Sequence, residues 1–308
     1  MSTTHSGNRA LAALDGASVW LNSEPLTADE LSGQVVLVDF WTYSCVNWLR
    51  TLPYLSAWER RYRDRGLVLV GAHAPEFSFE HDLENLRRAT RELGVGYPVV
   101  VDNGFEIWRS FGNNYWPAVY LIDREGEVRF HHFGEGAYEE TERAIQQLLG
   151  IREEIAGVDA GGVSEAADLD TIGSPETYLG SARGERRSHS PAPGLALNSW
   201  ALTGGWSVGD ESAVLDSSPG SVAYRFLARD VNLVLAPPPA GAPTRFSIRL
   251  DGQPPGGDHG LDTDEAGEGS VSEPRMYQLV RQRGRVAERD FEITFEEPGV
   301  RAYVFTFG

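Results

Sequence analysis

Hydrophobic and polar residues follow different patterns in the two halves of the chain. Up to about residue 150, short apolar runs rich in valine, such as 34–41 and 67–74, alternate with segments whose apolar residues recur every three or four positions. Such apolar runs predict buried central strands, and the spaced segments predict amphipathic helices. Strands that alternate with helices in this way indicate an α/β domain.

The best-defined helix is predicted between those two strands. Leu49, Leu52 and Leu55 begin a series of apolar residues at helical spacing that continues to Tyr62, so residues 46–65 are expected to form one helix. A strand, this helix and a second strand make a βαβ unit. The same reasoning predicts helices over about 83–93, 105–111 and 138–149, a strand over 97–101 and an antiparallel hairpin over 118–132.

The pattern changes after the last of these helices. Residues 151–175 are rich in glycine, alanine and acidic residues and lack periodic apolar positions, which predicts a linker. Farther along, apolar and polar residues alternate, as in Val222, Tyr224 and Phe226, and turn-forming clusters separate such runs. Several short strands with little helix indicate an all-β jelly-roll sandwich. The expected division is a flexible N-terminus over 1–16, an α/β domain over 17–150, the linker over 151–175 and the β-sandwich domain over 176–308.

The charge of the chain excludes two classes of partner. The 27 Lys and Arg residues stand against 45 Asp and Glu residues, a formal net charge of −18, so nucleic-acid phosphates and anionic membrane surfaces both repel the protein. No apolar run approaches the roughly twenty residues that span a bilayer, and the N-terminal segment shows no secretory signal. We therefore expect a cytoplasmic protein that binds neither nucleic acid nor membrane.

The sequence contains a single cysteine, Cys45. One cysteine excludes an internal disulfide, a cysteine-rich zinc site and an iron–sulfur cluster. Cys45 directly follows the first long strand and begins the helix, where unpaired N–H groups favour the thiolate and lower the cysteine pKa. Cys45 is therefore a candidate nucleophile. His131 and His132 are neighbours on a predicted strand and point to opposite faces, so they cannot chelate one ion, and neither a metal nor a cofactor is expected.

The surroundings of this cysteine resemble a known superfamily. The sequence FW-x-x-x-C at 40–45, Pro53 inside the following helix and Trp116-Pro117 before the hairpin resemble the thioredoxin-like superfamily. Within it, the chain is similar to the soluble portion of the DipZ family in WTYSC at 41–45, GLVLVGAHAPEF at 66–77, YPVVVDN at 97–103, YWPAVYLID at 115–123 and FGEG at 133–136. The resemblance implies a thioredoxin-like domain followed by a carbohydrate-binding-module-like β-sandwich.

The chain departs from that family at one position. Where the family has the second cysteine of Cys-x-x-Cys, this chain has Trp48, so the dithiol cycle is chemically impossible. A single thiolate can still attack a disulfide or a peroxide, and it then needs an external thiol or thiol reductant as partner. Thr42, three residues before Cys45, repeats part of the peroxiredoxin pattern P-x-x-x-T-x-x-C, but Val38 occupies the position of its proline.

Further candidate residues are expected around Cys45. Trp48 either shields the sulfur or stacks on an aromatic ligand, or else it fills the space of the missing cysteine. Glu76 either accepts a proton as a second catalytic residue or caps the next helix, and Glu135 either faces the groove or is a turn residue. The other residues expected to line a substrate groove are Trp41, Thr42, Tyr43, Ser44, Asn47, His73, Trp116 and Pro117, and the bond between the last two is a candidate cis peptide.

Three functions stay open from the sequence. The leading hypothesis is a monothiol oxidoreductase of cell redox homeostasis, whose Cys45 thiolate reacts with a disulfide, a peroxide or another electrophile. The second is a redox-inactive binding or scaffold protein with a degenerate site. The third is a non-redox enzyme in which Glu76 or His73 acts as base for Cys45.

The role of the second domain is open as well. Trp200 and Trp206 flank a glycine pair and form either an aromatic platform for sugar rings or part of the core. A small-molecule or glycan ligand at the domain interface is a further expectation, because clefts between domains are common ligand sites.

Overall fold

The computed structural model describes residues 11–155, 157–188, 194–239 and 243–308. The chain divides into two compact units, of which the first ends at Ser164 and the second begins at Glu165. The dividing point falls within residues 151–175, the segment that the sequence predicts to be a linker. The Ser164 hydroxyl donates a hydrogen bond to the Leu49 carbonyl oxygen at 2.8 Å, so the end of the first unit is attached to its own helix.

The first unit is built on a six-stranded mixed sheet with the strand order β1-β4-β3-β2-β5-β6. Strands β2, β3 and β4 are parallel to one another, and all other neighbouring pairs are antiparallel. The strands are β1 (Trp20–Leu21), β2 (Val35–Trp41), β3 (Leu67–His73), β4 (Val99–Val101), β5 (Ala118–Ile122) and β6 (Val128–Phe133). This is the mixed α/β sheet that the sequence predicts.

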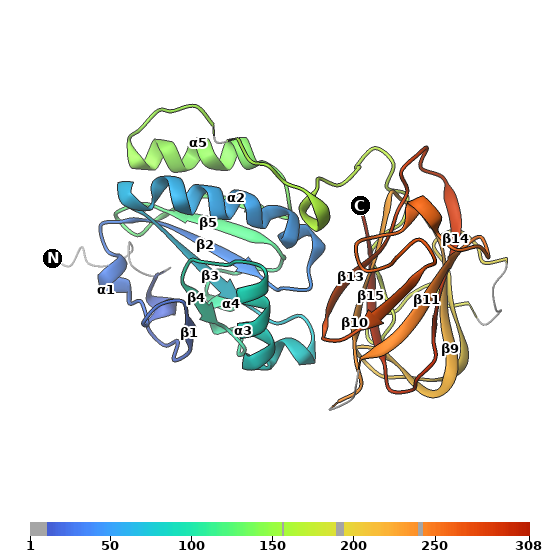
Figure 1. Ribbon diagram of the computed structural model, residues 1–308. Coiled ribbons are helices and arrows are strands. Elements are labelled where there is room, and N and C mark those ends of the chain that lie inside the picture. The colour runs from blue at the N-terminus through green and yellow to red at the C-terminus, as the bar shows by residue number, and fades with distance from the viewer. Residues whose placement is uncertain (1–10, 156, 189–193, 240–242) are drawn as a thin grey trace. The chain divides into compact units, whose positions relative to one another are not determined.

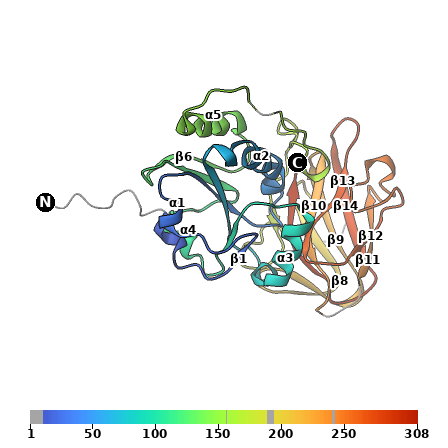
Figure 2. The same cartoon turned by 60° about the vertical axis from the view of Figure 1, so that its left-hand side comes forward.

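Helices cover both faces of this sheet, and α2 and α5 lie side by side on one face (Figures 1 and 2). The Glu142 carboxylate joins these two helices, because it accepts hydrogen bonds from the Trp58 indole at 3.1 Å and from the Tyr62 hydroxyl at 2.6 Å. The helices are α1 (Ala28–Leu31), α2 (Val46–Tyr62), α3 (Leu83–Glu92), α4 (Glu106–Ser110) and α5 (Tyr138–Leu149), with short 3-10 turns at Leu11–Leu14, Arg63–Arg65, Ser78–His81 and Gly162–Ser164.

Strand β2 is the centre of the first unit, because all seven of its residues are buried. Val36, Val38 and Phe40 contribute to a core cluster on one face of the sheet, together with residues of α1 and α4. The intervening positions, among them Asp39 and Trp41, face α2. A strand buried on both faces explains why its sequence is almost continuously apolar.

The N-terminal boundary differs from the sequence prediction. A flexible segment is expected over 1–16, but residues 11–14 form a 3-10 turn whose Leu11 and Leu14 are buried in the same core cluster. Apolar side chains at this spacing cover the face of the sheet that α1 and α4 leave open. Residues 1–10 lie outside the described part of the chain.

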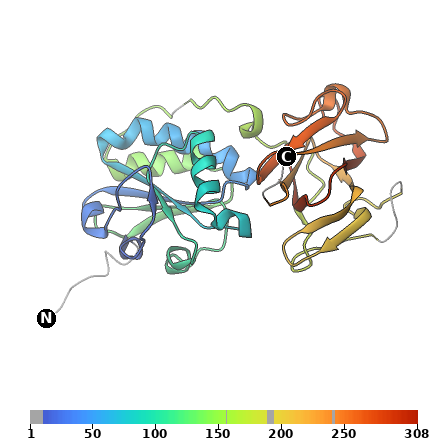
Figure 3. The ribbon, with the colours of Figure 1, turned by 60° about the horizontal axis from the view of Figure 1, so that its bottom comes forward.

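The second unit is a nine-stranded antiparallel sheet that curls around a shared interior (Figure 3). Its main path is β12-β11-β14-β9-β15-β10-β13, with β7 beside β15 and β8 beside β9. The strands are β7 (Thr177–Tyr178), β8 (Trp200–Val208), β9 (Ala213–Leu227), β10 (Asp230–Ala236), β11 (Thr244–Leu250), β12 (Glu268–Val271), β13 (Arg275–Arg281), β14 (Glu288–Phe295) and β15 (Arg301–Phe307). The all-β class predicted for this half is confirmed.

The tryptophans of this unit belong to its core. Trp200 is buried in the main hydrophobic cluster, and its indole N–H donates to the Glu185 carbonyl oxygen at 2.7 Å. Trp206 is half-buried and meets the Phe295 ring edge-on at 6.1 Å. The sugar-platform reading of this pair is therefore wrong for Trp200, because a fully buried ring offers no face to a ligand.

One glycine of the central sheet is required for packing. A Cβ atom at Gly71 would lie 2.8 Å from Trp41 Nε1 and 2.9 Å from Tyr97 Cε2, and both rings are buried. We expect Gly71→Ala to lower the free energy of unfolding by about 1–3 kcal/mol, measured by urea denaturation, because overpacking forces buried rings to shift. Gly96→Ala is the matched control, since nothing lies within 4 Å of its Cβ position. Equal stability of the two variants would contradict this account.

Candidate active site

Cys45 lies at the end of β2, where it is the N-cap residue of α2. Its backbone N–H donates to the Thr42 carbonyl oxygen at 3.3 Å, and its carbonyl oxygen accepts from the Leu49 N–H at 3.0 Å. The loop therefore turns directly into a helix of 17 residues. The thiol is half-buried, and Cys45 Sγ lies 3.9 Å from the Trp116 carbonyl oxygen.

Trp116 and Pro117 form the opposite side of this site. The peptide bond between them is cis, and the Pro117 carbonyl oxygen accepts from the Gly134 N–H at 2.8 Å. The Trp116 indole donates to the Ala74 carbonyl oxygen at 3.0 Å, at the end of β3. The structure thus brings this predicted pair next to the sulfur and fixes it to two strands.

The Trp48 side chain turns into the core. It has no exposed surface, its indole N–H donates to Asp39 Oδ2 at 2.9 Å, and its ring stacks on Trp41 with centroids 4.2 Å apart. A ring held in this way has no face for stacking on a ligand. The geometry supports the reading that Trp48 fills the space of the missing cysteine.

Asp39 is the partner that sequence reasoning missed. Its carboxyl is fully buried on the central strand, and burial raises its pKa to about 7, against the lowering effect of the Trp48 hydrogen bond. The signal in the sequence was an acidic residue inside the apolar run 34–41, which interrupts a strand predicted to be buried on both faces. A carboxyl at such a position needs a hydrogen-bond donor.

A buried carboxyl, that of Glu80, is hydrogen-bonded to the cysteine loop. Glu80 is fully buried and accepts hydrogen bonds from the Ser44 hydroxyl at 2.7 Å and from the backbone N–H groups of Glu76 and Phe77 at 2.6 and 2.9 Å. Burial raises its pKa to about 7, opposed by the hydrogen bonds from Thr42 and Ser44. One signal for this role is visible in the sequence, since Glu80 follows two aromatic residues in the segment F-S-F-E.

The next α-helix, α3, is capped by an aspartate. Asp82 caps α3, because its carboxylate accepts from the N–H groups of Glu84 and Asn85 at 2.8 and 3.2 Å. Glu76 itself is half-buried, in the loop that follows β3.

His73 is unsuited to act as a base. The imidazole is fully buried, and burial lowers its pKa to about 3. It stacks on the Tyr43 ring at 5.9 Å and meets the Trp41 ring edge-on at 5.0 Å. A histidine that stays neutral far below pH 7 is a poor proton acceptor for a thiol.

The remaining predicted residues lie in the cysteine loop, on the first turn of α2 and in the turn after β6. Tyr43 and Thr42 are buried within the cysteine loop, and the Thr42 hydroxyl lowers the pKa of the Glu80 carboxyl. Asn47 is half-buried on the first turn of α2. Glu135 forms an ion pair with Arg50 at 3.0 Å, and the Arg50 side chain is 4% exposed. Glu135 therefore fastens the turn after β6 to α2, in agreement with its reading as a turn residue.

The described residues contain neither a group of metal ligands nor a membrane-spanning helix. Within 11–155, 157–188, 194–239 and 243–308, no three His, Cys, Asp or Glu residues are grouped so that they could hold a metal ion. Over the same residues, each helix is too short or too polar to cross a bilayer.

Comparison with known proteins agrees with this architecture. Residues 14–131 match the AhpC/TSA family, and residues 174–308 match a family described as thioredoxin like C-terminal domain. The chain thus consists of a thioredoxin-like redoxin domain and a C-terminal domain that accompanies thioredoxin-like domains. It is a homologue of Protein DipZ of Mycobacterium bovis, with 32% identity over 96% of this chain and 42% of DipZ. The chain therefore spans about two fifths of the length of that relative.

Smaller relatives match the first unit alone. The thiol-disulfide oxidoreductase YkuV of Bacillus subtilis is 28% identical over 44% of this chain and 91% of its own length. A thioredoxin-like protein whose solution structure is known in the oxidised form is 26% identical, with a TM-score of 0.42 over 47% of this chain and 98% of that one.

The buried Asp39 carboxyl predicts a specific dependence of stability on pH. Its pKa is about 7 in the folded chain and about 3.9 in an unfolded one, so between these values the folded state holds the extra proton. The free energy of unfolding therefore falls as pH rises through this window, by up to about 1.4 kcal/mol per unit. We expect Asp39→Asn to make this fall shallower without abolishing it, measured by urea denaturation between pH 4.5 and 7.5, because the buried Glu80 carboxyl, whose pKa is also raised to about 7, contributes the remainder.

The exposed residue Asp64 supplies the control for this experiment, because its side chain is 91% exposed. Asp64→Asn should keep the wild-type pH dependence. If Asp39→Asn and wild type follow parallel curves, the carboxyl is ionised throughout the range and the assignment is wrong.

Proposed function

We propose that the chain is a thiol oxidoreductase in which Cys45 carries the redox chemistry alone. The observation that supports this most directly is the position of the only cysteine, at the N-terminus of a long helix with its sulfur beside the cis-proline turn. The positive end of α2 stabilises a thiolate. The name of the similar YkuV, a thiol-disulfide oxidoreductase, supports the same reaction class.

With a disulfide, the Cys45 thiolate attacks one sulfur, a mixed disulfide forms, and the other sulfur leaves as a thiolate. An external thiolate then attacks the mixed disulfide, so Cys45 is released as thiolate and the electrons come from that external thiol. No second cysteine exists in the chain to perform this step internally. The reductant is therefore a partner, as either a small thiol or a dithiol protein.

A disulfide is favoured over a peroxide as the electrophile. In the peroxiredoxin pattern the threonine hydroxyl helps to orient the peroxide, but Thr42 is fully buried here. A buried hydroxyl cannot reach a peroxide that approaches from solvent. The Cys45 sulfur beside the Trp116 carbonyl oxygen, in contrast, is only half-buried and can meet a disulfide directly.

One observation favours a second candidate function, a redox-inactive binding or scaffold protein. Trp48 is hydrogen-bonded and stacked in the core, so the position of a resolving cysteine is occupied by a well-packed side chain. A domain that no longer performs dithiol exchange can keep a large, well-packed side chain at this position. The two functions differ in the expected reactivity of Cys45, because only the first needs a stabilised thiolate.

The test is the rate of Cys45 alkylation by iodoacetamide between pH 4 and 10, read by intact mass. We expect an inflection well below the free-cysteine value of about 8.5. One equivalent of oxidised glutathione should then add a single glutathionyl group, which excess thiol removes, and Cys45→Ser should show neither reaction. An ordinary inflection with no mixed disulfide would overturn the proposal and favour the scaffold function.

A second variant tests the framework around the thiol. Trp48→Cys restores the Cys-x-x-Cys spacing, and we expect it to form an intramolecular disulfide and to reduce insulin, with a dithiol as electron donor, faster than wild type does. Removal of the buried indole should lower the free energy of unfolding by about 3–5 kcal/mol. Trp48→Ala removes the same indole without adding a thiol and should form no intramolecular disulfide and show no such acceleration, and Trp48→Cys combined with Cys45→Ser should likewise form no such disulfide.

A further inference from the structure

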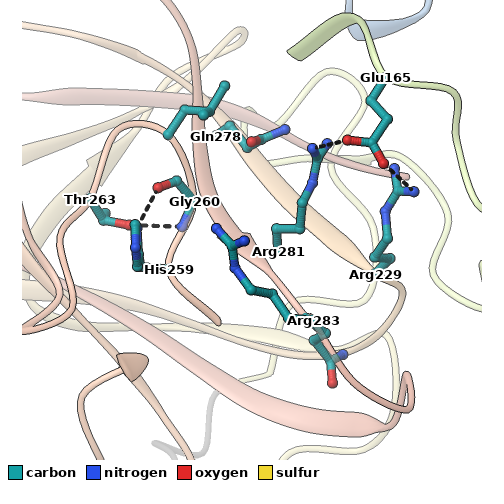
Figure 4. A pocket seen from close by; sticks show the side chains of 10 residues that line it. Glu165, Arg229, His259, Gly260, Thr263, Gln278, Arg281 and Arg283 are labelled. Atoms are coloured by element: carbon teal, nitrogen blue, oxygen red, sulfur yellow. Dashed lines mark hydrogen bonds and ion pairs between the residues drawn. The ribbon is translucent and has the colours of Figure 1, made fainter. Parts of the chain in front are cut away.

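The second unit contains a pocket that the chemistry of Cys45 does not use. It has a volume of about 690 Å³, within the range of small-molecule sites. Figure 4 shows it between two groups of residues, with Arg229, Arg281 and Glu165 on one side and His259, Gly260 and Thr263 on the other.

The lining is cationic in a strongly acidic protein. Arg229, Arg281 and Arg283 line the pocket, and Glu165 is the only carboxylate among the lining residues. Asp230, which is fully buried, accepts from Arg281 Nε at 2.6 Å and from Arg229 at 2.7 Å. These two arginines are therefore neutralised within the protein by neighbouring carboxylates, among which Asp168 also acts on Arg229.

Arg283 differs from the other two arginines of the lining. Arg229 and Arg281 are both held by Asp230 and Glu165, with Arg281 2.5 Å from Glu165 Oε2. The Arg283 side chain is exposed and forms no ion pair with any residue in the described part of the chain. A planar guanidinium without a partner is suited to a carboxylate, which it can bind through two parallel hydrogen bonds.

Two further groups of the pocket require hydrogen-bond donors. Gln278 is 3% exposed, and within the described residues its side-chain Oε1 has no hydrogen-bond partner. A buried amide oxygen without a donor is costly, so a ligand or water must supply one. His259 Nδ1 lies 2.8 Å from the Gly260 carbonyl oxygen and donates to it, which leaves Nε2 as the acceptor of the neutral ring.

Hydrogen bonds to the backbone of β13 hold one wall of the pocket in place. The Gly260 N–H donates to the Leu279 carbonyl oxygen at 2.9 Å, and the Thr263 hydroxyl donates to the same oxygen at 2.8 Å. A Cβ atom at Gly260 would lie 2.2 Å from the Gln278 carbonyl oxygen, so only glycine allows the loop to approach β13 this closely. Leu261, 62% exposed, adds an apolar surface to the same lining.

We infer that this pocket binds a small monocarboxylate that carries neighbouring hydroxyl groups, such as a sugar acid. The Arg283 guanidinium binds the carboxylate, Gln278 and His259 accept hydrogen bonds from hydroxyl groups, and Leu261 contacts the C–H face of the carbon skeleton. A neutral sugar lacks the charge for Arg283. A simple carboxylate lacks the donors for Gln278.

The test is isothermal titration calorimetry of the full chain with D-glucuronate, D-glucose, acetate and inorganic phosphate. We expect saturable binding of glucuronate, with glucose and acetate at least tenfold weaker. Arg283→Ala should weaken glucuronate binding at least tenfold, whereas Arg285→Ala, an exposed arginine outside the lining, should leave it unchanged. Thermal unfolding monitored by circular dichroism checks that both variants are folded.

Three results would overturn the inference. If glucuronate does not bind saturably, the ligand is not a hydroxylated monocarboxylate. If phosphate binds more tightly than glucuronate, the pocket binds phosphate instead. If Arg283→Ala binds glucuronate as tightly as wild type does, glucuronate does not bind in this pocket. Cys45→Ser should bind glucuronate as wild type does, because the lining residues all belong to the second unit. The outcome is therefore independent of the redox proposal.

Discussion

The hydrogen bond between the Trp48 indole and the Asp39 carboxyl is the interaction on which the first unit depends most. A carboxyl without exposed surface on a central strand would be strongly destabilising if it had no donor. The indole that supplies the donor belongs to the first turn of α2, so satisfying the carboxyl also fixes this turn against the sheet. The position of Cys45 at the start of α2 follows from that attachment.

A second buried carboxyl fixes the other side of the cysteine loop. Glu80 accepts three short hydrogen bonds, one from Ser44 and two from the backbone after β3, and so joins the loops that follow two neighbouring parallel strands. The two carboxyls have raised pKa values for the same physical reason, burial, although they lie on different elements. Near neutral pH, both carboxyls can take up a proton, and each is hydrogen-bonded to a residue close to Cys45 in the sequence, Trp48 or Ser44.

The helices and strands could be predicted from the sequence, but the side-chain contacts within the candidate site could not. The strands and α2 could be predicted because burial on one or both faces leaves a periodic pattern, and α5 begins and ends at the predicted residues, Tyr138 and Leu149. The role of Glu80 could not be predicted, because it depends on which side chains turn inward after β3. Likewise, the direction of the Trp48 ring depends on Asp39, nine residues away on another element.

The packing of Trp48 also bears on how this chain could change over generations. A single base separates the tryptophan codon from either cysteine codon, so a return to two cysteines is a short genetic step. The same substitution would leave a cavity beside Trp41 and remove the indole donor from Asp39. The obstacle to regaining a second cysteine is therefore a cost in stability, and it arises in the buried interior rather than at the reactive surface.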